Sequence, residues 1–228
     1  MTTRTDTSHD PESRGLRLVP ALLALTVVSG LIDAVSYLGL GHVFTANMTG
    51  NVVVLGFAAA GAPGFSVAHT MTSLGGFLAG AVTGGRSVVR FGGGPRRSWA
   101  RGTFAAEAVL LGACAAAAFA APDAPATAYV LIAVTSFAMG LRNATVRKLG
   151  VADLTTTVLT MTLTGLAADS RLGGGAGHHS PRRTASVFAM SAGALLGAWL
   201  VLHHGLAVPL LVAALVAAVL ALTSSGRE

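Results

Sequence analysis

Long apolar stretches alternate with short polar or basic links along most of this chain. About 20 apolar residues are needed for an α-helix to span a bilayer. Segments of roughly that length predict spanning helices over 17–40, 66–85, 103–121, 125–146, 184–202 and 206–222. Two further segments, 44–62 and 153–168, are shorter or more polar and are rich in Thr or Asn. The pattern predicts an all-α polytopic membrane protein with six transmembrane helices and two re-entrant or broken segments.

Composition supports a membrane environment. Hydrophobic residues make up 53% of the chain and charged residues only 11%, whereas soluble domains carry about 25% charged residues. A water-soluble fold of this composition would lack the charge to cover its surface. The one cysteine, Cys114, lies in an apolar run, which excludes an intrachain disulfide and a cysteine-based metal site. We therefore expect the lipid bilayer as the main partner and no metal.

The chain divides simply along its length. We expect a disordered cytoplasmic tail over 1–16, a single membrane domain over 17–222 and a short C-terminal tail over 223–228. The link near Asp123 separates the membrane domain into two halves, 17–121 and 125–222. A single domain is expected because neither half has a polar linker long enough to separate it from the other.

Basic residues predict the orientation. The formal net charge is +6, but the basic residues sit in short links between apolar segments, which indicates topology rather than a nucleic-acid partner. The linker 86–101 carries five arginines and no acid, so it should be cytoplasmic. If 44–62 and 153–168 dip in and return, that linker and both termini lie in the cytoplasm. If both segments cross, the linker falls outside. The first arrangement is favoured, although 44–62 is long enough to cross.

The second half repeats residues of the first in the same order. The matches are Gly30, Leu31, Asp33, Ala34 and Thr45 with Gly140, Leu141, Asn143, Ala144 and Thr155, then Thr49 with Thr160, and Gly76, Gly80 and Ala81 with Gly193, Gly197 and Ala198. Three crossings in each half would invert one half relative to the other. Inverted repeats are typical of transporters, whose binding sites lie near discontinuous segments at the midplane.

Two GxxxG pairs predict close helix packing, because glycine lets two backbones approach. They are Gly76 with Gly80 and Gly193 with Gly197. Packing within one subunit is the favoured interpretation. A dimer interface is the alternative, and it leaves a homo-oligomer open.

Polar residues inside the apolar segments are the candidates for a substrate or ion pathway. An ionisable group at membrane depth is a functional candidate by default, and Asp33 is such a group. The full predicted set is Asp33, Ser36, Asn47, Thr49, Asn51, Asn143 and Thr160. The structural alternative is that these groups cap helices or hydrogen-bond to neighbouring backbone, which threonine does readily.

Glu107 and Arg142 form a possible proton or ion-pair site. Glu107 lies near the arginine-rich linker, so a salt bridge to Arg101 or Arg97 is expected ahead of a proton-relay role. Arg142 is expected near the cytoplasmic face, where its side chain can snorkel to the membrane surface. Binding of an anionic substrate is the alternative for Arg142.

Two strings give the chain a family resemblance. DAVSYLGLGHVFTANMTGNVVVLG and GLRNATVRKLGVADLTTTVLTMTLTGLAADS resemble the YoaK family of bacterial integral membrane proteins, a domain of unknown function (DUF1275). The resemblance implies a multi-pass protein of the bacterial cytoplasmic membrane with about six helices. It implies no substrate, cofactor or site residue. Arg142 and Met161 stand where the family would lead us to expect a polar amide and a glycine.

Three functions are compatible with these observations. The first is a small-solute transporter or channel with a polar site between the repeats. The second is a non-transporting scaffold or accessory subunit, in which the polar residues only hold helices together. The third is an intramembrane enzyme. Its one candidate nucleophile–base pair is Ser36 near His42, and no third residue that would orient the base is identified. The sequence contains none of the common nucleotide-binding or catalytic motifs, so we expect neither an enzyme nor a cofactor.

Overall fold

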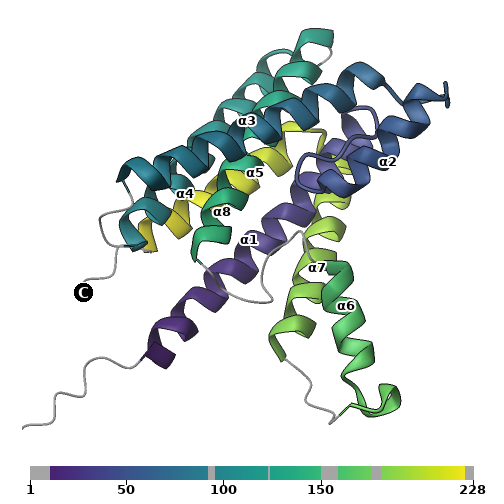
Figure 1. Ribbon diagram of the computed structural model, residues 1–228. Coiled ribbons are helices and arrows are strands. Elements are labelled where there is room, and N and C mark those ends of the chain that lie inside the picture. Colours follow the sequence, from purple (N-terminus) through teal and green to yellow (C-terminus); the bar gives the residue numbers. More distant parts are fainter. Residues whose placement is uncertain (1–10, 92–95, 123, 150–158, 176–180, 224–228) are drawn as a thin grey trace, which may run out of the picture.

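The computed structural model describes residues 11–91, 96–122, 124–149, 159–175 and 181–223, and this part of the chain is helical (Figure 1). The elements in chain order are α1 (Pro11–Gly39), α2 (Met48–Ala59), α3 (Val67–Phe91), α4 (Arg96–Ala120), α5 (Pro125–Leu149), α6 (Leu159–Ala168), the 3-10 turn η2 (Arg171–Gly173), α7 (Pro181–His204) and α8 (Ala207–Thr223). The all-helical fold class is therefore confirmed.

Each segment predicted to span the membrane forms a helix. By length and composition, four helical stretches can cross a bilayer: Pro20–Gly39, Ala100–Ala120, Pro125–Lys148 and Pro181–His204, counted over the described residues. α8 is apolar but has 17 residues, and α3 has 25 residues and carries Arg86 and Arg90. α1 begins at Pro11, within the stretch expected as a tail.

The two polar segments contain short helices. α2 has 12 residues and α6 has 10, so at 1.5 Å per residue each is shorter than the roughly 30 Å hydrocarbon core. The loops on either side of α2 meet, because His42 Nδ1 lies 3.0 Å from the carbonyl oxygen of Gly64. Residues 153–158 of the second segment lie outside the described part of the chain.

α1 and α7 pack backbone to backbone through glycine. A Cβ added to Gly193 would lie 2.0 Å from the carbonyl oxygen of Val27, and one added to Gly197 would lie 2.6 Å from that of Leu31. Residue numbers rise together along both helices, so α1 and α7 run parallel. Gly30 makes the reciprocal contact, since its added Cβ would lie 2.2 Å from the carbonyl oxygen of Met190.

α3 and α5 pack in the same way. A Cβ on Gly80 would lie 2.0 Å from the carbonyl oxygen of Phe137, and one on Gly76 would lie 2.8 Å from that of Ala133. Gly140 makes the reciprocal contact, since a Cβ added to it would lie 2.0 Å from the carbonyl oxygen of Phe77. α3 and α5 are therefore also parallel. Both GxxxG pairs of the sequence thus pack against helices of the same chain.

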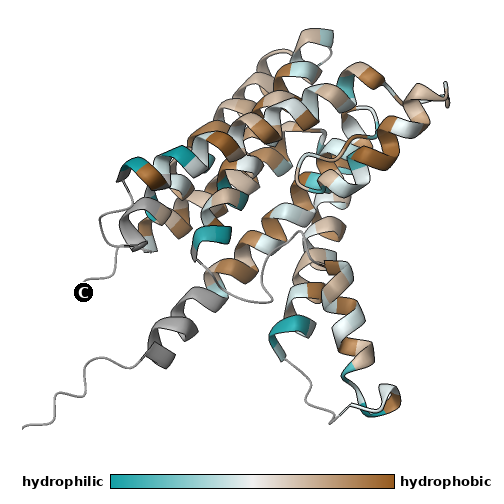
Figure 2. Ribbon diagram, in the orientation of Figure 1, coloured by the Kyte–Doolittle hydropathy of each residue, from teal (hydrophilic) through white to brown (hydrophobic). Residues whose placement is uncertain are grey.

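Large apolar side chains cover both the interior and the outer surface. Leu111, Leu131 and Leu210 are fully buried where α4, α5 and α8 meet. Val109 and Leu195 are 71% and 74% exposed, and Figure 2 shows apolar residues along the outward faces of the long helices. An exposed apolar surface of this extent is suited to lipid rather than water.

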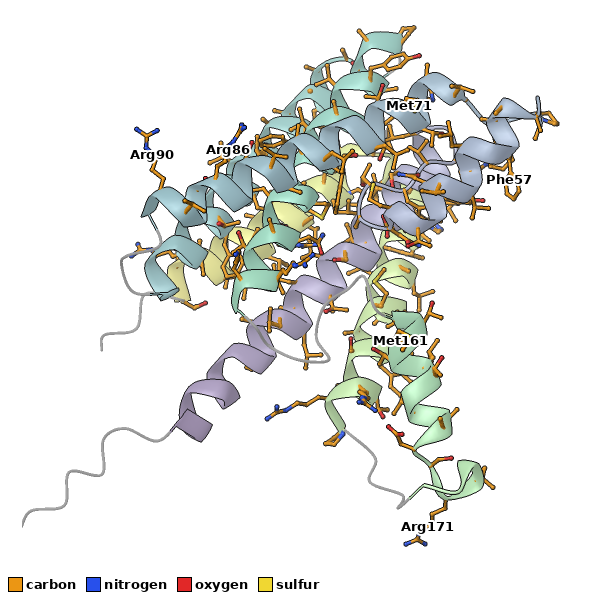
Figure 3. The ribbon with its side chains drawn as sticks, viewed as in Figure 1. Phe57, Met71, Arg86, Arg90, Met161 and Arg171 are labelled. Atoms are coloured by element: carbon orange, nitrogen blue, oxygen red, sulfur yellow. The ribbon has the colours of Figure 1, made fainter. Side chains whose placement is uncertain are left out.

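Basic residues gather at one end of the long helices. Figure 3 shows Arg86 and Arg90 at the end of α3 opposite to Met71. The N-terminal parts of α1 and α4 meet the C-terminal parts of α5 and α8 at this same end, in an apolar cluster that includes Phe104 and Val146. α1, α4 and α7 therefore run away from this end, and α3, α5 and α8 run toward it.

We expect Gly140→Ala to lower the free energy of unfolding by about 1–3 kcal/mol, because its methyl group would collide with the backbone of α3. Gly85→Ala is the matched control, since a Cβ there meets nothing within 4 Å. The control should be neutral or gain up to about 1 kcal/mol from helix propensity. Thermal unfolding of the detergent-purified protein measures both. Equal stability of the two variants would contradict the close packing.

Candidate functional site

The first buried polar group is Asp33 in α1. Its side chain is 6% exposed. Oδ1 accepts hydrogen bonds from the backbone N–H groups of Thr45, Ala46 and Asn47 at 3.2, 2.8 and 3.3 Å. These residues form the loop between α1 and α2. Because a buried backbone N–H group without a partner costs free energy, Asp33 fixes this loop against α1.

Asn51 fixes the same loop from the side of α2. The backbone N–H of Phe44 donates to Asn51 Oδ1 at 2.8 Å, and Asn51 Nδ2 donates to the Phe44 carbonyl at 2.5 Å. The side-chain amide thereby satisfies both backbone polar groups of Phe44. Nδ2 also donates to Ser73 Oγ of α3 at 2.9 Å. Asn51 is fully buried, so these hydrogen bonds are shielded from solvent.

Two serines extend these contacts to the second half of the chain. Ser73 Oγ donates to the Phe44 carbonyl at 2.6 Å and lies 2.9 Å from Ser136 Oγ of α5. We call the set of Asp33, Phe44, Asn51, Ser73 and Ser136 the Asp33 network. Asn51, Ser73 and Ser136 join α2, α3 and α5 through buried hydrogen bonds to one another and to the Phe44 backbone. Asp33 of α1 is attached to them through the backbone of the loop, whose N–H groups at 45–47 it accepts. The buried hydrogen bonds of Asn51, Ser73 and Ser136 rigidify the contact between these helices and specify one arrangement of it.

A second buried polar cluster lies around Arg142, which is 2% exposed. Its Nη1 donates to Glu107 Oε1 of α4 at 2.9 Å, and its Nη2 donates to Ser29 Oγ of α1. Nη2 also lies 3.0 Å from Met139 Sδ. The cluster therefore ties α1, α4 and α5 together.

The partners of Glu107 and Arg142 differ from those predicted. Arg142 does not snorkel to the surface, and Glu107 pairs with Arg142 in place of Arg101 or Arg97. The reason is that α4 and α5 pack side by side and bring Glu107 and Arg142 to the same depth. Arg101 lies nearly two turns earlier on α4 and is exposed. The side chain of Arg97 lies outside the described residues.

The predicted pathway residues are not all brought together. The exposed side chain of Asn47 caps α2 by accepting the Gly50 N–H at 3.3 Å, and Thr49 is exposed. Asn143 Nδ2 donates to the Met139 carbonyl of its own helix at 2.8 Å. Thr160 is an exposed residue of α6, which packs on α7. Asp33 and Asn51 are therefore the two predicted side chains that share a buried network.

Ser36 and His42 do not form a nucleophile–base pair. Ser36 Oγ donates to the Asp33 carbonyl at 3.2 Å, whereas His42 Nδ1 bonds the Gly64 carbonyl. Because a carbonyl only accepts, Nδ1 of His42 carries the proton. No group of three His, Cys, Asp or Glu residues suited to a metal ion occurs in the part of the chain that the structure describes.

Three serines of these clusters were not among the predicted site residues. Ser73 lies three and seven residues before Gly76 and Gly80, so this spacing places it on the close-packing face of α3. Ser136 precedes Gly140 by four residues in the same manner. Ser29, Asp33 and Ser36 likewise follow a helical spacing of four and three. The serines could have been found by asking which polar residues share a helix face with the glycines or with Asp33.

Comparison with known proteins identifies relatives of the chain. A family model described as "Protein of unknown function (DUF1275)" matches residues 21–223. The chain is 38% identical over 152 residues to the UPF0700 transmembrane protein YoaK of Bacillus subtilis (strain 168). That match covers 65% of this chain and 64% of the relative, which is less than two thirds of the relative's length. No solved structure matches the chain.

We expect Arg142→Met to destabilise the protein by about 3–5 kcal/mol, because it leaves the Glu107 carboxylate buried without its partner. The double variant Glu107→Leu with Arg142→Met should regain most of that loss. Arg101→Gln serves as the control and should cost less than about 1 kcal/mol, since Arg101 is exposed. Unfolding in detergent measures all three. A large loss for Arg101→Gln, or no recovery in the double variant, would argue against the pairing.

Proposed function

The chain belongs to the DUF1275 family of membrane proteins of unknown function, and from this premise we propose that it is a small-solute transporter or channel. The observation that carries the proposal is the Asp33 network. It places a carboxylate and a carboxamide inside an apolar helix bundle, beside the break between α1 and α2. Ionisable groups at membrane depth mark solute and ion pathways, and transporter sites form where helices are discontinuous.

An inverted internal repeat is the second element of the proposal. In the sequence, Gly30 corresponds to Gly140, and the pair Gly76 and Gly80 corresponds to the pair Gly193 and Gly197. In space, Gly30 packs on the helix that carries Gly193 and Gly197, whereas Gly140 packs on the helix that carries Gly76 and Gly80. Matched glycines therefore make matched contacts, each with the opposite half, and this supports a two-fold relation between the halves.

The remaining helix contacts agree with the same relation. If α1 to α4 correspond to α5 to α8, the contact of α2 with α3 corresponds to that of α6 with α7. The contact of α4 with α5 corresponds to that of α8 with α1. The contact of α4 with α8 is unchanged when the two halves are exchanged, because each of these helices takes the place of the other. Each of these pairs is in contact. Corresponding helices run in opposite directions, as an inverted repeat requires.

We propose six crossings, made by α1, α3, α4, α5, α7 and α8. The opposite directions of α1 and α3 support a dipping α2 segment, and those of α5 and α7 support a dipping α6 segment. The basic residues then lie at the cytoplasmic face of the bacterial cytoplasmic membrane, as the positive-inside rule expects. Both termini lie on that face as well.

A scaffold or accessory subunit remains the second candidate. The observation in its favour is that Asn51, Ser73 and Ser136 bond to one another and to the Phe44 backbone. Such bonds hold helices together without requiring a solute. The scaffold predicts loss of folded yield when the network is broken, with no solute flux at any stage. Transport rather than catalysis is proposed because the Ser36 hydroxyl bonds the Asp33 carbonyl and no base among the described residues hydrogen-bonds to it.

For the transporter, we expect Asp33→Asn and Asn51→Ala to reduce solute flux at least tenfold per folded molecule. Flux is measured by stopped-flow light scattering of proteoliposomes against a panel of small neutral and singly charged solutes. Thr26→Val is the matched control, because Thr26 is buried on α1 and its hydroxyl bonds the Leu22 carbonyl at 2.9 Å. It should retain flux. If the native protein transports no solute of the panel, the scaffold is favoured. If flux is unchanged in both Asp33→Asn and Asn51→Ala, the proposed site is wrong.

For the topology, we expect single cysteines at Ala60 and His204 to be labelled from outside and those at Arg90 and Arg171 from the cytoplasm. The background is Cys114→Ala, which removes the native thiol. A membrane-impermeant maleimide applied to intact cells and to inverted vesicles makes the measurement. Labelling of Arg90→Cys from outside would mean that the α2 segment crosses, and the inverted repeat would then be wrong.

A further inference from the structure

The two carboxylate oxygens of Asp33 have different surroundings. Oδ1 accepts the three N–H groups of the loop 45–47. Oδ2 is buried and has no hydrogen-bond partner among the described residues. The guanidinium group of Arg142 is engaged by Glu107 and Ser29, so it does not neutralise Oδ2 by direct contact. One oxygen of a buried acid is therefore available to a ligand.

Thr45 supplies a second oxygen of the same kind. Its Oγ1 is buried and has no hydrogen-bond partner in the part of the chain that the structure describes, and the residue is fully buried. Its backbone N–H donates to Asp33 Oδ1 at 3.2 Å, so the residue that carries this hydroxyl is in direct contact with the carboxylate. Buried threonines within the long helices, such as Thr26 and Thr135, bond a carbonyl of their own helix. Thr45 lies in a loop, where its hydroxyl bonds no carbonyl of the described residues.

We propose that Asp33 Oδ2 and Thr45 Oγ1 are ligands of a monovalent metal cation such as Na⁺, a proposal that deepens the transporter function and rests on it. Carboxylate and hydroxyl oxygens are hard ligands, which suit hard cations. One carboxylate balances one positive charge. Calcium would require six to eight oxygen ligands, commonly from several carboxylates, and the immediate surroundings hold one. The imidazole or thiolate groups that transition metals prefer are not gathered here among the described residues.

A cation at this position would act on the segment that carries the site. Asp33 belongs to α1, whereas Thr45 belongs to the loop that Asn51 and Ser73 hold against α2 and α3. Occupancy would therefore strengthen the attachment of this loop to α1. Loss of the cation would leave an uncompensated charge at the joint and weaken that attachment. The site thus couples the binding of an ion to the position of the α2 segment, which is what ion-driven transport needs.

The test is thermal unfolding of the purified full chain in detergent, with NaCl exchanged for choline chloride at constant ionic strength. We expect the Tm of the native protein to rise saturably with Na⁺, by roughly 5–10 °C at 100 times Kd. Asp33→Asn and Thr45→Val should each abolish most of the rise. Thr45→Ser keeps the hydroxyl and should retain it, and Thr26→Val is the buried control that should behave like the native protein.

Several outcomes would overturn the site. A Tm that does not respond to Na⁺, K⁺ or Li⁺ in the native protein would do so, as would a rise that survives in both Asp33→Asn and Thr45→Val. A response to lowered pH alone would make Oδ2 a proton site instead. If Thr45→Val does not fold, the comparison of Thr45→Ser with Asp33→Asn still decides. Solute flux is measured separately, so flux without a cation effect would reject this inference and leave the transporter function standing.

Discussion

The structure depends on the pairing of backbone polar groups where the helices are interrupted. Water is scarce inside a bilayer, so each N–H and carbonyl group of a non-helical segment needs a partner within the protein. The loop after α1 meets this requirement with side chains. Asp33 takes three of its N–H groups, and Asn51 takes both polar groups of Phe44. These two residues therefore hold an irregular segment against the helices α1 and α3.

The sequence predicts most of the architecture, because apolar length and glycine spacing are local properties. The helical class and the resemblance to the YoaK family are both confirmed, the latter by the family match over residues 21–223. Asp33 and Asn51 were recognisable as candidates because polar groups are rare in such segments. The partners of Arg142 were not predictable in this way. They depend on which helices lie side by side, and sequence neighbours such as Arg101 are poor guides to that.

Small residues determine which helices lie side by side. Gly30 and Gly140 admit the backbones of α7 and α3, so these close backbone contacts join the first half of the chain to the second. Spacing in the sequence reveals that a glycine face exists, but it does not reveal which partner fills it. The serines Ser73 and Ser136 follow the same glycine faces, and for that reason a polar network crosses between α3 and α5.

The exchange of contacts between the halves has a consequence for biosynthesis. Gly30 meets Met190, which is 160 residues later in the chain. At 5–20 residues per second, the ribosome needs on the order of ten seconds to produce α7 after α1. During that interval the glycine face of α1 lacks its α7 partner and is open to lipid or to the insertion machinery. The protein therefore cannot mature as two successive units, and its first half completes its packing only after α7 has been made.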